Sequence, residues 1–278
     1  MTAAEHHNDN AVLVNGFSNI GRTETTNQTA VYPLQWYCAP DSWPNDESGQ
    51  REGRDGSWHV VVDRDTLVVA PPAKKDFWRK TYYSPTLVKD DGPCLFATVP
   101  DNQTVMAETM FTIASTSTKG LRQFDQAGIC VRFDSEHWLK TGIEIVDGIP
   151  RLSCVCTNSY SDWSTQKYWK PTATDVRIRV HVLQSSAARS IVVEAWEEAA
   201  SEWQFIRICH LSVQAIVHPD PLVNEGAWSG RAAPPGNVYV GIFAACPEDQ
   251  TGAIVTFHEF TIVEGSTFQH DADGNHEK

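Results

Sequence analysis

Residues 125–148 read Asp-Gln-Ala-Gly-Ile-Cys-Val-Arg-Phe-Asp-Ser-Glu-His-Trp-Leu-Lys-Thr-Gly-Ile-Glu-Ile-Val-Asp-Gly, and this stretch decides the fold. Apolar and polar residues alternate along it twice, and a period of two predicts two strands joined by a turn. The apolar side of this predicted hairpin carries Ala127, Ile129, Val131, Phe133, Leu139, Ile143 and Ile145. The opposite side carries Gln126, Gly128, Cys130, Arg132, Trp138, Lys140, Gly142 and Glu144. Charges of both signs beside an amide, an indole and two bare glycines make a face that can hold a polar ligand.

The pairing of the two strands is restricted by parity. Directly opposed residues of an antiparallel pair share a face, so their numbers sum to an even value and the loop has an odd length. Two registers remain: a turn at residues 134–136, with Arg132 opposite Trp138 and Gln126 opposite Glu144, or a turn at residues 134–138, with Arg132 opposite Lys140 and Gly128 opposite Glu144. The first is preferred because it avoids two directly opposed cations.

Length and charge narrow the class of protein. A chain of 278 residues can build one large core, and all-β sandwiches of this size are commonly single domains. The net charge of -13 and the pI near 5.1 leave no basic stripe, so neither nucleic acid nor a membrane is expected as a partner. The first ten residues lack the features of a secretory signal, and no run of about 18 apolar residues occurs, so a cytoplasmic location is expected.

The seven cysteines are odd in number and scattered through strand-like segments. This distribution favours reduced, buried thiols over a disulfide framework. Cys154 and Cys156 fall on the same face of a strand, but a second Cys or His pair at the spacing of a zinc site is missing from the sequence. We therefore expect no metal and no cofactor.

Turn signals divide the chain into three parts. Residues 1–30 are polar and predict a flexible arm, residues 31–265 form the folded domain, and residues 266–278 form a polar tail. Two long loops are expected at residues 43–58 and 215–236. Strands are predicted, with no helix of ordinary length, at residues 58–62, 66–70, 95–99, 104–113, 126–133, 138–146, 151–157, 176–183, 191–196, 203–211, 237–245 and 253–263.

Many short strands with regular turn signals predict a jelly-roll β-sandwich of two antiparallel sheets. Residues 176–183 repeat the two-faced pattern of the hairpin: Val176, Ile178, Val180 and Val182 on one side, Arg177, Arg179 and His181 on the other. These polar sides are expected to join in one charged outer face, which the twist of the sheet would curve into a groove.

Three blocks of sequence point to a family. Asp76-Phe77-Trp78-Arg79-Lys80-Thr81, the hairpin, and Ser161-Asp162-Trp163-Ser164 resemble the regulation-of-enolase protein family, a branch of the concanavalin A-like lectin and glucanase superfamily. The resemblance covers about residues 58–263 and implies a jelly-roll sandwich with a ligand-sized groove. For the fungal protein that gives the family its name, the resemblance implies a role in controlling a glycolytic enzyme. Tyr82-Tyr83 departs from the family pattern, which often has a histidine there, and the arm and long loops look like additions that a partner could use.

Catalysis is less favoured than binding. Glycosidases need two converging carboxylates, and related glucanases carry them as Glu-x-Asp-x-Glu, a pattern that this chain lacks. Glu144 is the only carboxylate in the middle of the polar face, although Asp125 lies near it in the preferred register. No catalytic residue is therefore assigned, and a glycoside-active enzyme that uses Glu144 stays a second hypothesis.

The favoured function is non-catalytic binding of a carbohydrate or sugar-phosphate-like metabolite, combined with regulation of a metabolic enzyme such as enolase. The sequence is also compatible with a purely structural, salt-bridged sheet face, and with a protein-interaction module that has no small ligand. The predicted groove floor comprises Gln126, Arg132, Lys140 and Glu144, with Trp78 or Trp163 stacking at its wall. The full set of predicted ligand-binding residues is Trp78, Arg79, Gln126, Arg132, Lys140, Glu144, Asp162, Trp163 and His181.

Overall fold

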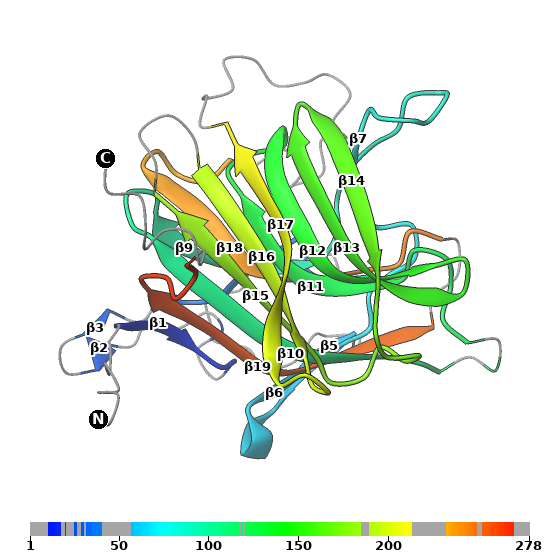
Figure 1. Cartoon of the computed structure of the whole chain (residues 1–278), viewed down its shortest axis with the longest axis horizontal. Helices are drawn as coiled ribbons and strands as arrows, with labels where there is room; N and C mark the ends of the chain where they lie inside the picture. Colours follow the sequence, from blue (N-terminus) through cyan, green and yellow to red (C-terminus); the bar gives the residue numbers. More distant parts are fainter. Residues whose placement is uncertain are drawn as a thin grey trace.

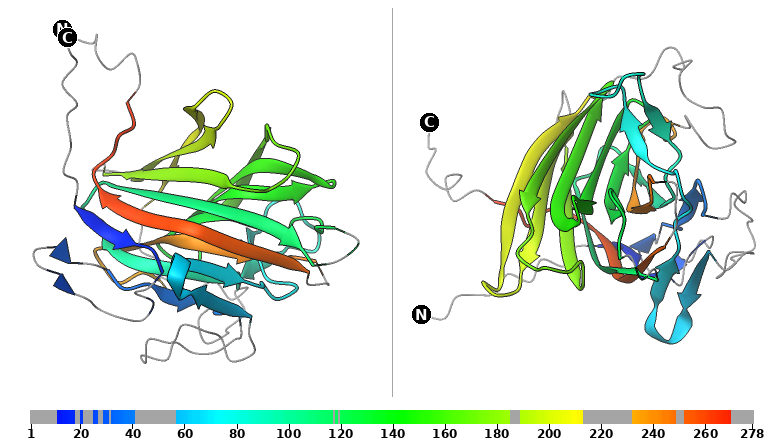
Figure 2. Two further views of the ribbon diagram at one scale, coloured as in Figure 1. Left: turned by 90° about the horizontal axis from the view of Figure 1, so that it is seen from below. Right: turned by 90° about the vertical axis from the view of Figure 1, so that its right-hand side faces the viewer.

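The computed structural model describes residues 11–17, 20, 25–26, 29–30, 32–40, 57–116, 118, 120–184, 189–212, 232–248 and 252–269. They form two large antiparallel sheets that lie face to face as two layers (Figure 1, Figure 2). This is the predicted single-domain jelly-roll β-sandwich. Within these ranges the helical content is one 3-10 turn, Val62–Arg64, at the tip of a hairpin. None of the helices in this part of the chain could cross a membrane.

The first sheet has eight strands. In order across the sheet they are β17 (Glu202–Leu211), β16 (Arg189–Glu197), β15 (Val176–Leu183), β10 (Val105–Ser115), β19 (Ala253–Glu264), β6 (Thr66–Val69) and β5 (Trp58–Val61). The eighth, β1 (Val12–Asn15), also pairs with β19.

The second sheet has seven strands. In order they are β14 (Tyr160–Lys167), β13 (Ile149–Asn158), β12 (His137–Val146), β11 (Gln126–Arg132), β18 (Asn237–Ala245), β9 (Cys94–Pro100) and β4 (Gln35–Tyr37). Two small ribbons complete the fold: β2 (Thr25–Thr26) with β3 (Thr29–Ala30), and β7 (Phe77–Arg79) with β8 (Val88–Asp90). The predicted strands are thus largely confirmed, while β1, β2, β3, β4, β7, β8 and β14 were not predicted.

The main hydrophobic core fills the space between the sheets. The apolar side of the β11–β12 hairpin enters it from one sheet, as predicted, with residues such as Ile129 and Leu139 fully buried. The apolar side of β15, including Ile178 and Val180, enters it from the other sheet. Burial of these two faces against each other provides the main stabilisation of the sandwich.

The register of the central hairpin is the preferred one. Gln126 lies opposite Glu144 and Arg132 opposite Trp138. The backbone N–H of Phe133 donates to the carbonyl of His137 at 2.9 Å, so residues 134–136 form the turn. Asp134 fixes this turn because its Oδ1 accepts the backbone N–H groups of residues 136 and 137, both at 2.8 Å.

The two glycines on the polar side of the hairpin have a structural cause. A Cβ built on Gly128 would lie 2.0 Å from the carbonyl oxygen of Thr141, and one on Gly142 would lie 2.0 Å from that of Ala127. The paired backbones therefore approach too closely for any side chain. This corrects the sequence interpretation, in which the missing side chains made room for a ligand.

Two predictions about the organisation of the chain are also corrected. β15 belongs to the eight-stranded sheet, so His181 does not share a face with the hairpin. Part of the predicted flexible arm is folded: Leu13, Val14 and Phe17 are buried in the core because β1 extends the sheet along β19. Most of the two predicted long loops and of the C-terminal tail lies outside the described residues.

Candidate functional site

The polar side of the hairpin lies on the outer face of the seven-stranded sheet, where β7 and β8 cover it. Phe77 of β7 packs against Trp138, with ring centroids 5.8 Å apart. Both belong to a second, smaller hydrophobic cluster, which also contains Tyr37, Phe96 and Phe243. The predicted groove floor is therefore largely buried rather than exposed.

The β7–β8 ribbon is anchored by a buried ion pair. Arg132 donates from both terminal nitrogens to Asp90, at 2.6 and 2.8 Å, and both side chains are almost fully buried. The Tyr37 ring lies 4.7 Å from the guanidinium carbon, and its hydroxyl donates to Asp90 at 3.2 Å. Burial alone would lower the pKa of Arg132, but the charge of Asp90 raises it above its usual value. Arg132 is thus committed to holding β8 on the sheet.

Beside this anchor lies the polar cluster, which we define as Asp76, Gln126, Lys140 and Glu144. Asp76 Oδ1 accepts hydrogen bonds from Lys140 Nζ at 2.6 Å and from Gln126 Nε2 at 3.2 Å. It also accepts the backbone N–H of Phe77 at 2.7 Å. Asp76 therefore connects the start of the covering ribbon to two neighbouring strands of the sheet.

Glu144 completes the cluster from the middle of β12. Its Oε2 accepts hydrogen bonds from Ser153 Oγ at 2.6 Å and from Trp163 Nε1 at 3.0 Å. Glu144 is 5% exposed, and this burial raises the pKa of its carboxyl even though Lys140 opposes the shift. The structure has thus placed a carboxyl of increased proton affinity beside a lysine and an indole N–H.

Aromatic rings surround the polar cluster on its solvent side; we call Trp78, Tyr83, Phe124 and Trp163 the aromatic rim. Trp163 makes edge-to-face contacts with Trp78 and with Phe124, each with centroids 6.3 Å apart, and Trp78 makes another with Tyr83 at 5.7 Å. Trp163 and Tyr83 remain 39% and 40% exposed. Burial raises the pKa of Tyr83, and the charges of Asp76 and Glu144 raise it further, which places this phenol near both carboxyls.

Five of the nine residues predicted from the sequence meet at this site: Trp78, Gln126, Lys140, Glu144 and Trp163. Arg132 lies deeper, in the ion pair described above. The other three lie elsewhere. Arg79 points away to pair with Glu136. His181 lies on the outer face of the eight-stranded sheet, where it contacts Glu194 at 2.8 Å. Asp162 points to the opposite side of β14 from Trp163, because successive strand residues alternate.

Several residues of the site were missed by the sequence analysis. Asp76 and Tyr83 lie in or next to the quoted family block but were given no role, while Asp90, Phe124 and Ser153 carry no local signal at all. Asp90 contacts Arg132 across 42 positions of sequence, and Asp76 contacts Lys140 across 64. Alternation along a strand cannot predict such long-range contacts.

Asp125 and Glu144 do not converge. The carbonyl of Asp125 accepts the backbone N–H of Ile145, a core residue, and the Asp125 side chain is fully buried on the core side of the sheet, near Cys246. Glu144 lies on the outer face. The carboxylate that accompanies Glu144 on that face is Asp76, whose charge acts on its pKa.

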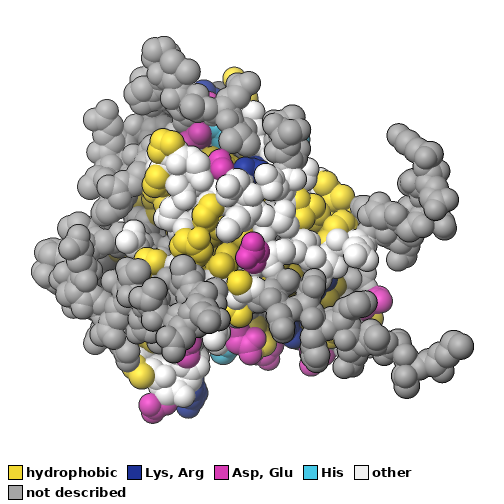
Figure 3. All heavy atoms as spheres, turned by 90° about the vertical axis from the view of Figure 1, so that its left-hand side faces the viewer, with side chains coloured by type: hydrophobic (Ala, Val, Ile, Leu, Met, Phe, Trp, Pro, Cys, Tyr) yellow, Lys and Arg dark blue, Asp and Glu magenta, His cyan; other side chains and the backbone are white. Residues whose placement is uncertain are grey.

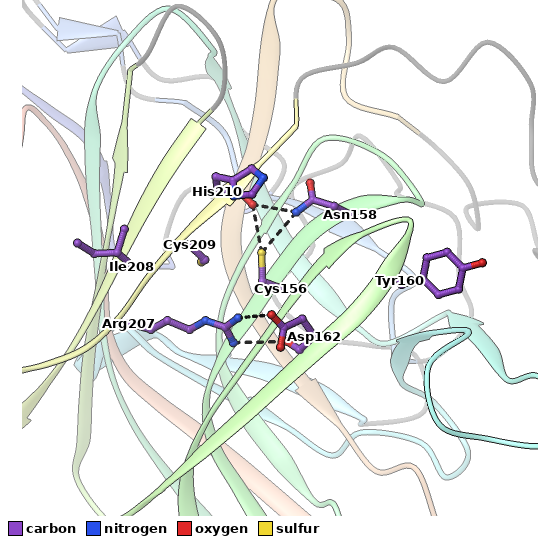
Figure 4. Close-up of a pocket in the computed structure, with 8 residues that line it drawn as sticks. All are labelled: Cys156, Asn158, Tyr160, Asp162, Arg207, Ile208, Cys209 and His210. Atoms are coloured by element: carbon purple, nitrogen blue, oxygen red, sulfur yellow. Dashed lines mark hydrogen bonds and ion pairs between the residues drawn. The ribbon is translucent and has the colours of Figure 1, made fainter.

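A separate pocket of about 360 Å³ opens where β13 and β14 meet β17 (Figure 4). Arg207 crosses it and donates to Asp162 Oδ2 at 2.7 Å and to Ser164 Oγ at 2.9 Å. The side chain of Asn158 donates to the carbonyl of His210 at 2.9 Å. The residues that line this pocket are Cys156, Asn158, Tyr160, Asp162, Arg207, Ile208, Cys209 and His210. Among the described residues, no group of three or more His, Cys, Asp or Glu side chains is arranged to hold a metal ion.

Comparison with known proteins places this fold and these blocks in one family. A family model described as "Protein of unknown function (DUF1349)" matches residues 54–264, more than half of the chain. The chain belongs to the DUF1349 family. The match includes the whole polar cluster and aromatic rim, and also the pocket at β13 and β17.

Two relatives of this DUF1349 protein are fungal. It is 40% identical over 141 residues to "Regulation of enolase protein 1" of Saccharomyces cerevisiae. The aligned segment covers 49% of this chain and 66% of the yeast protein, so this chain spans just under two thirds of the length of that relative. It is 23% identical over 208 residues to an uncharacterized protein of Emericella nidulans, over 73% of this chain and 88% of that one. The resemblance to the regulation-of-enolase family is confirmed.

A solved structure supports the fold of this DUF1349 protein. The crystal structure of a functionally unknown protein from Saccharomyces cerevisiae superposes with a TM-score of 0.56 at 28% sequence identity. It covers 78% of this chain and 95% of the other.

Proposed function

We propose that this DUF1349 protein is a non-catalytic, cytoplasmic binding protein whose polar cluster and aromatic rim hold a carbohydrate, and that it regulates a metabolic enzyme. The observation that carries the binding proposal is a half-exposed indole, Trp163, whose N–H is fixed on a buried carboxyl, Glu144. Sugars present flat C–H faces and ring hydroxyls, which suit an aromatic face beside a fixed hydrogen-bond acceptor.

The polar groups of the cluster suit this class of ligand. Both hydrogen bonds to Glu144 end on Oε2. Within the described part of the chain Oε1 accepts none, so it can accept one from a sugar hydroxyl. The charge of Lys140 is neutralised by that of Asp76. The net charge of the polar cluster is therefore set by the carboxyl of Glu144. A neutral or weakly anionic cluster favours a neutral sugar over a sugar phosphate, because a phosphate would face uncompensated carboxylate charge.

The regulatory part of the proposal rests on family membership. One relative is named as a regulator of enolase, and this chain shares 40% identity with it over 141 residues. We extend that role to this chain, with enolase as the first enzyme to test. On the face shown in Figure 3, the Lys and Arg side chains drawn among the described residues stand singly rather than as a stripe. With a net charge of -13, such a surface suits a neutral or cationic protein partner better than nucleic acid.

Calorimetric titration with a panel of neutral saccharides and their phosphates tests the binding proposal. We expect a neutral saccharide to bind, and Trp163→Ala and Glu144→Gln each to weaken binding by about tenfold or more. Trp203→Ala is the matched control, because Trp203 lies in the other sheet and stacks on Arg179. If Trp163→Ala binds as well as the unaltered chain, the site is structural.

Enolase activity measured with and without the purified chain tests the regulatory proposal. We expect a saturable change in activity, together with capture of enolase by the immobilised chain. Unchanged activity and no capture would remove the enolase role while leaving sugar binding to be judged by the titration.

One observation favours a second candidate, a glycoside-active enzyme that uses Glu144. Its raised pKa suits a general acid, and Asp76 supplies a second carboxylate on the same face. Turnover of an aryl glycoside that disappears in Glu144→Gln and in Asp76→Asn would support this enzyme. Binding without turnover supports the non-catalytic proposal.

A further inference from the structure

Three thiols meet where the two sheets approach each other at one edge of the sandwich. Cys154 and Cys156 of β13 point into the core from the seven-stranded sheet, and Cys209 of β17 reaches them from the eight-stranded sheet. The Cys209 thiol donates to the carbonyl of Ile191 at 3.8 Å, and it lies close enough to the other two thiols for both to raise its pKa. All three are free thiols. A disulfide from Cys209 to β13 would therefore link the two sheets covalently.

The pocket in Figure 4 determines which of these thiols a solute can reach. Cys156 and Cys209 line it, and Cys154 does not. The Cys156 sulfur is held at the wall by a hydrogen bond to the carbonyl of His210 at 3.3 Å, and Asn158 Nδ2 lies 3.9 Å from it. A pocket of about 360 Å³ is large enough to admit a small oxidant.

The Cys156 thiol donates to a carbonyl, yet its other neighbours lower its pKa and so increase the fraction of thiolate, which is the reactive form. The neighbouring Cys209 lowers the pKa of Cys156 despite the opposing effect of burial, and the nearby cation of Arg207 lowers it further. The neighbouring thiols of Cys154 and Cys156, together with burial, raise the pKa of Cys209, so that thiol keeps its proton. Cys156 is thus the thiol suited to the first nucleophilic attack, and Cys209 is the thiol that reacts in the second step.

We propose that Cys156 and Cys209 form a peroxide-reactive thiol pair, whose disulfide links the seven-stranded sheet to the eight-stranded sheet. The Cys156 thiolate attacks one oxygen of hydrogen peroxide, the O–O bond breaks, and hydroxide leaves, so Cys156 becomes a sulfenic acid. The Cys209 sulfur then attacks the Cys156 sulfur, the S–O bond breaks, and water leaves with the proton from Cys209. Two thiols lose two electrons, and one peroxide is reduced to two waters.

The chain contains its own control pair. Cys94 and Cys130 lie together in the second hydrophobic cluster, and both are 0% exposed. Burial raises the pKa of Cys94. Both pairs also have an arginine nearby, Arg207 beside Cys156 and Arg132 beside Cys94 and Cys130, so the feature that only the Cys156–Cys209 pair adds is the pocket.

Treatment of the full chain with hydrogen peroxide, followed by intact mass and non-reducing peptide mapping, tests the proposal. We expect the loss of two hydrogens and a peptide linked through Cys156 and Cys209, while Cys94 and Cys130 stay reduced. Cys156→Ser should slow oxidation by about tenfold or more, because the attacking thiolate is gone. Cys209→Ser should leave a sulfenic acid on Cys156 that dimedone traps, and Cys154→Ser should still form the link between Cys156 and Cys209.

Three outcomes of the mapping would overturn the assignment. Linkage of Cys94 to Cys130 at the same rate would show that the pocket has no role. Linkage of Cys156 to Cys154 would remove Cys209 from the pair, and undiminished oxidation of Cys156→Ser would remove Cys156. As a second readout, oxidation should raise the urea midpoint of unfolding, and dithiothreitol should reverse the increase; an unchanged midpoint would contradict a link between the sheets.

Discussion

Glu144 is the residue on which the candidate site depends most. It combines near-complete burial with hydrogen bonds from a hydroxyl and an indole. Burial of a carboxylate costs stability, and the chain retains it in the middle of a strand where an amide would make the same hydrogen bonds. Such a cost is typical of functional positions.

We predict that Glu144→Gln is at least as stable as the unaltered chain at neutral pH. The folded pKa of Glu144 is raised above its ordinary value of 4.5, so the folded state binds more protons than the unfolded state just above that pH. This contribution to stability is present at low pH and is lost as the pH rises through the folded pKa. The stability difference between variant and unaltered chain should therefore grow from about pH 4.5 upward, as measured by urea unfolding at several pH values. A difference that shrinks with rising pH would contradict it.

We predict that Gly142→Ala destabilises the chain by more than about 3 kcal/mol, because its Cβ would overlap a backbone carbonyl that cannot move without breaking the β11–β12 pairing. Gly148→Ala, two residues beyond β12, is the matched control: its φ of 76° disfavours alanine, but a Cβ there meets nothing within 4 Å. Its cost should stay near about 1 kcal/mol. Equal costs for the two variants would show that the close approach of the strands is not limiting.

At the scale of elements, the β7–β8 ribbon turns a sheet face into a site. The ribbon brings Asp76, Trp78 and Tyr83 over the hairpin, and the buried pair of Arg132 with Asp90 holds it there. Without this ribbon the polar cluster would be a solvated surface of little specificity.

We predict that Arg132→Met costs about 3 to 5 kcal/mol, because it leaves Asp90 buried without its cation. The double variant Arg132→Met with Asp90→Asn should recover part of this loss, since an amide still accepts the Tyr37 hydroxyl. Urea unfolding of the two variants provides the comparison. Breaking the exposed pair of Lys170 and Glu198 should leave stability nearly unchanged, and a loss there as large as that of Arg132→Met would contradict the ranking.

The free edge of β17 is covered by side chains from the other sheet. Asn158 donates to the carbonyl of His210 at 2.9 Å and accepts the N–H of Ser212 at 2.8 Å, and Gln166 donates to the carbonyl of Ile206 at 2.8 Å. These contacts occupy backbone groups that could otherwise pair with another chain.

We predict that Asn158→Ala costs about 1 kcal/mol and increases self-association through β17. Urea unfolding and analytical ultracentrifugation measure the two effects. Gln204→Ala is the control, because Gln204 bonds only to the side chains of Glu197 and Glu202 within the described contacts. Equal self-association of the two variants would show that the edge is not protected by Asn158.

At the scale of the whole molecule, the sequence predicted the features that depend on residues close together in the chain and missed those that depend on long-range contacts. Strict alternation in the central hairpin predicted its two faces, and the parity of pairing predicted its register. Alternation does not say which sheet a strand joins, so His181 was placed on the wrong side of the sandwich. The partner of Arg132 lies in a ribbon of three-residue strands, and that of Lys140 directly before it; such strands are too short to show a period. The two glycines of the hairpin were interpreted wrongly, because a glycine is required both where two backbones approach closely and where a ligand approaches a backbone. The sequence alone does not distinguish these two cases.

The same two sheets support two separate chemistries. The outer face of the seven-stranded sheet carries the polar cluster, while the edge between β13 and β17 carries the thiol pair (Figure 1, Figure 4). Because they lie on different faces, substitutions at one site should leave the other unaffected.

A crystal structure with the tightest-binding neutral saccharide tests sugar binding at the polar cluster most directly. We predict a sugar ring stacked on Trp163 with a hydroxyl within hydrogen-bond distance of Glu144, and loss of the bound sugar in Trp163→Ala crystals. A saccharide bound elsewhere, with the polar cluster and aromatic rim unchanged, would contradict the proposed site.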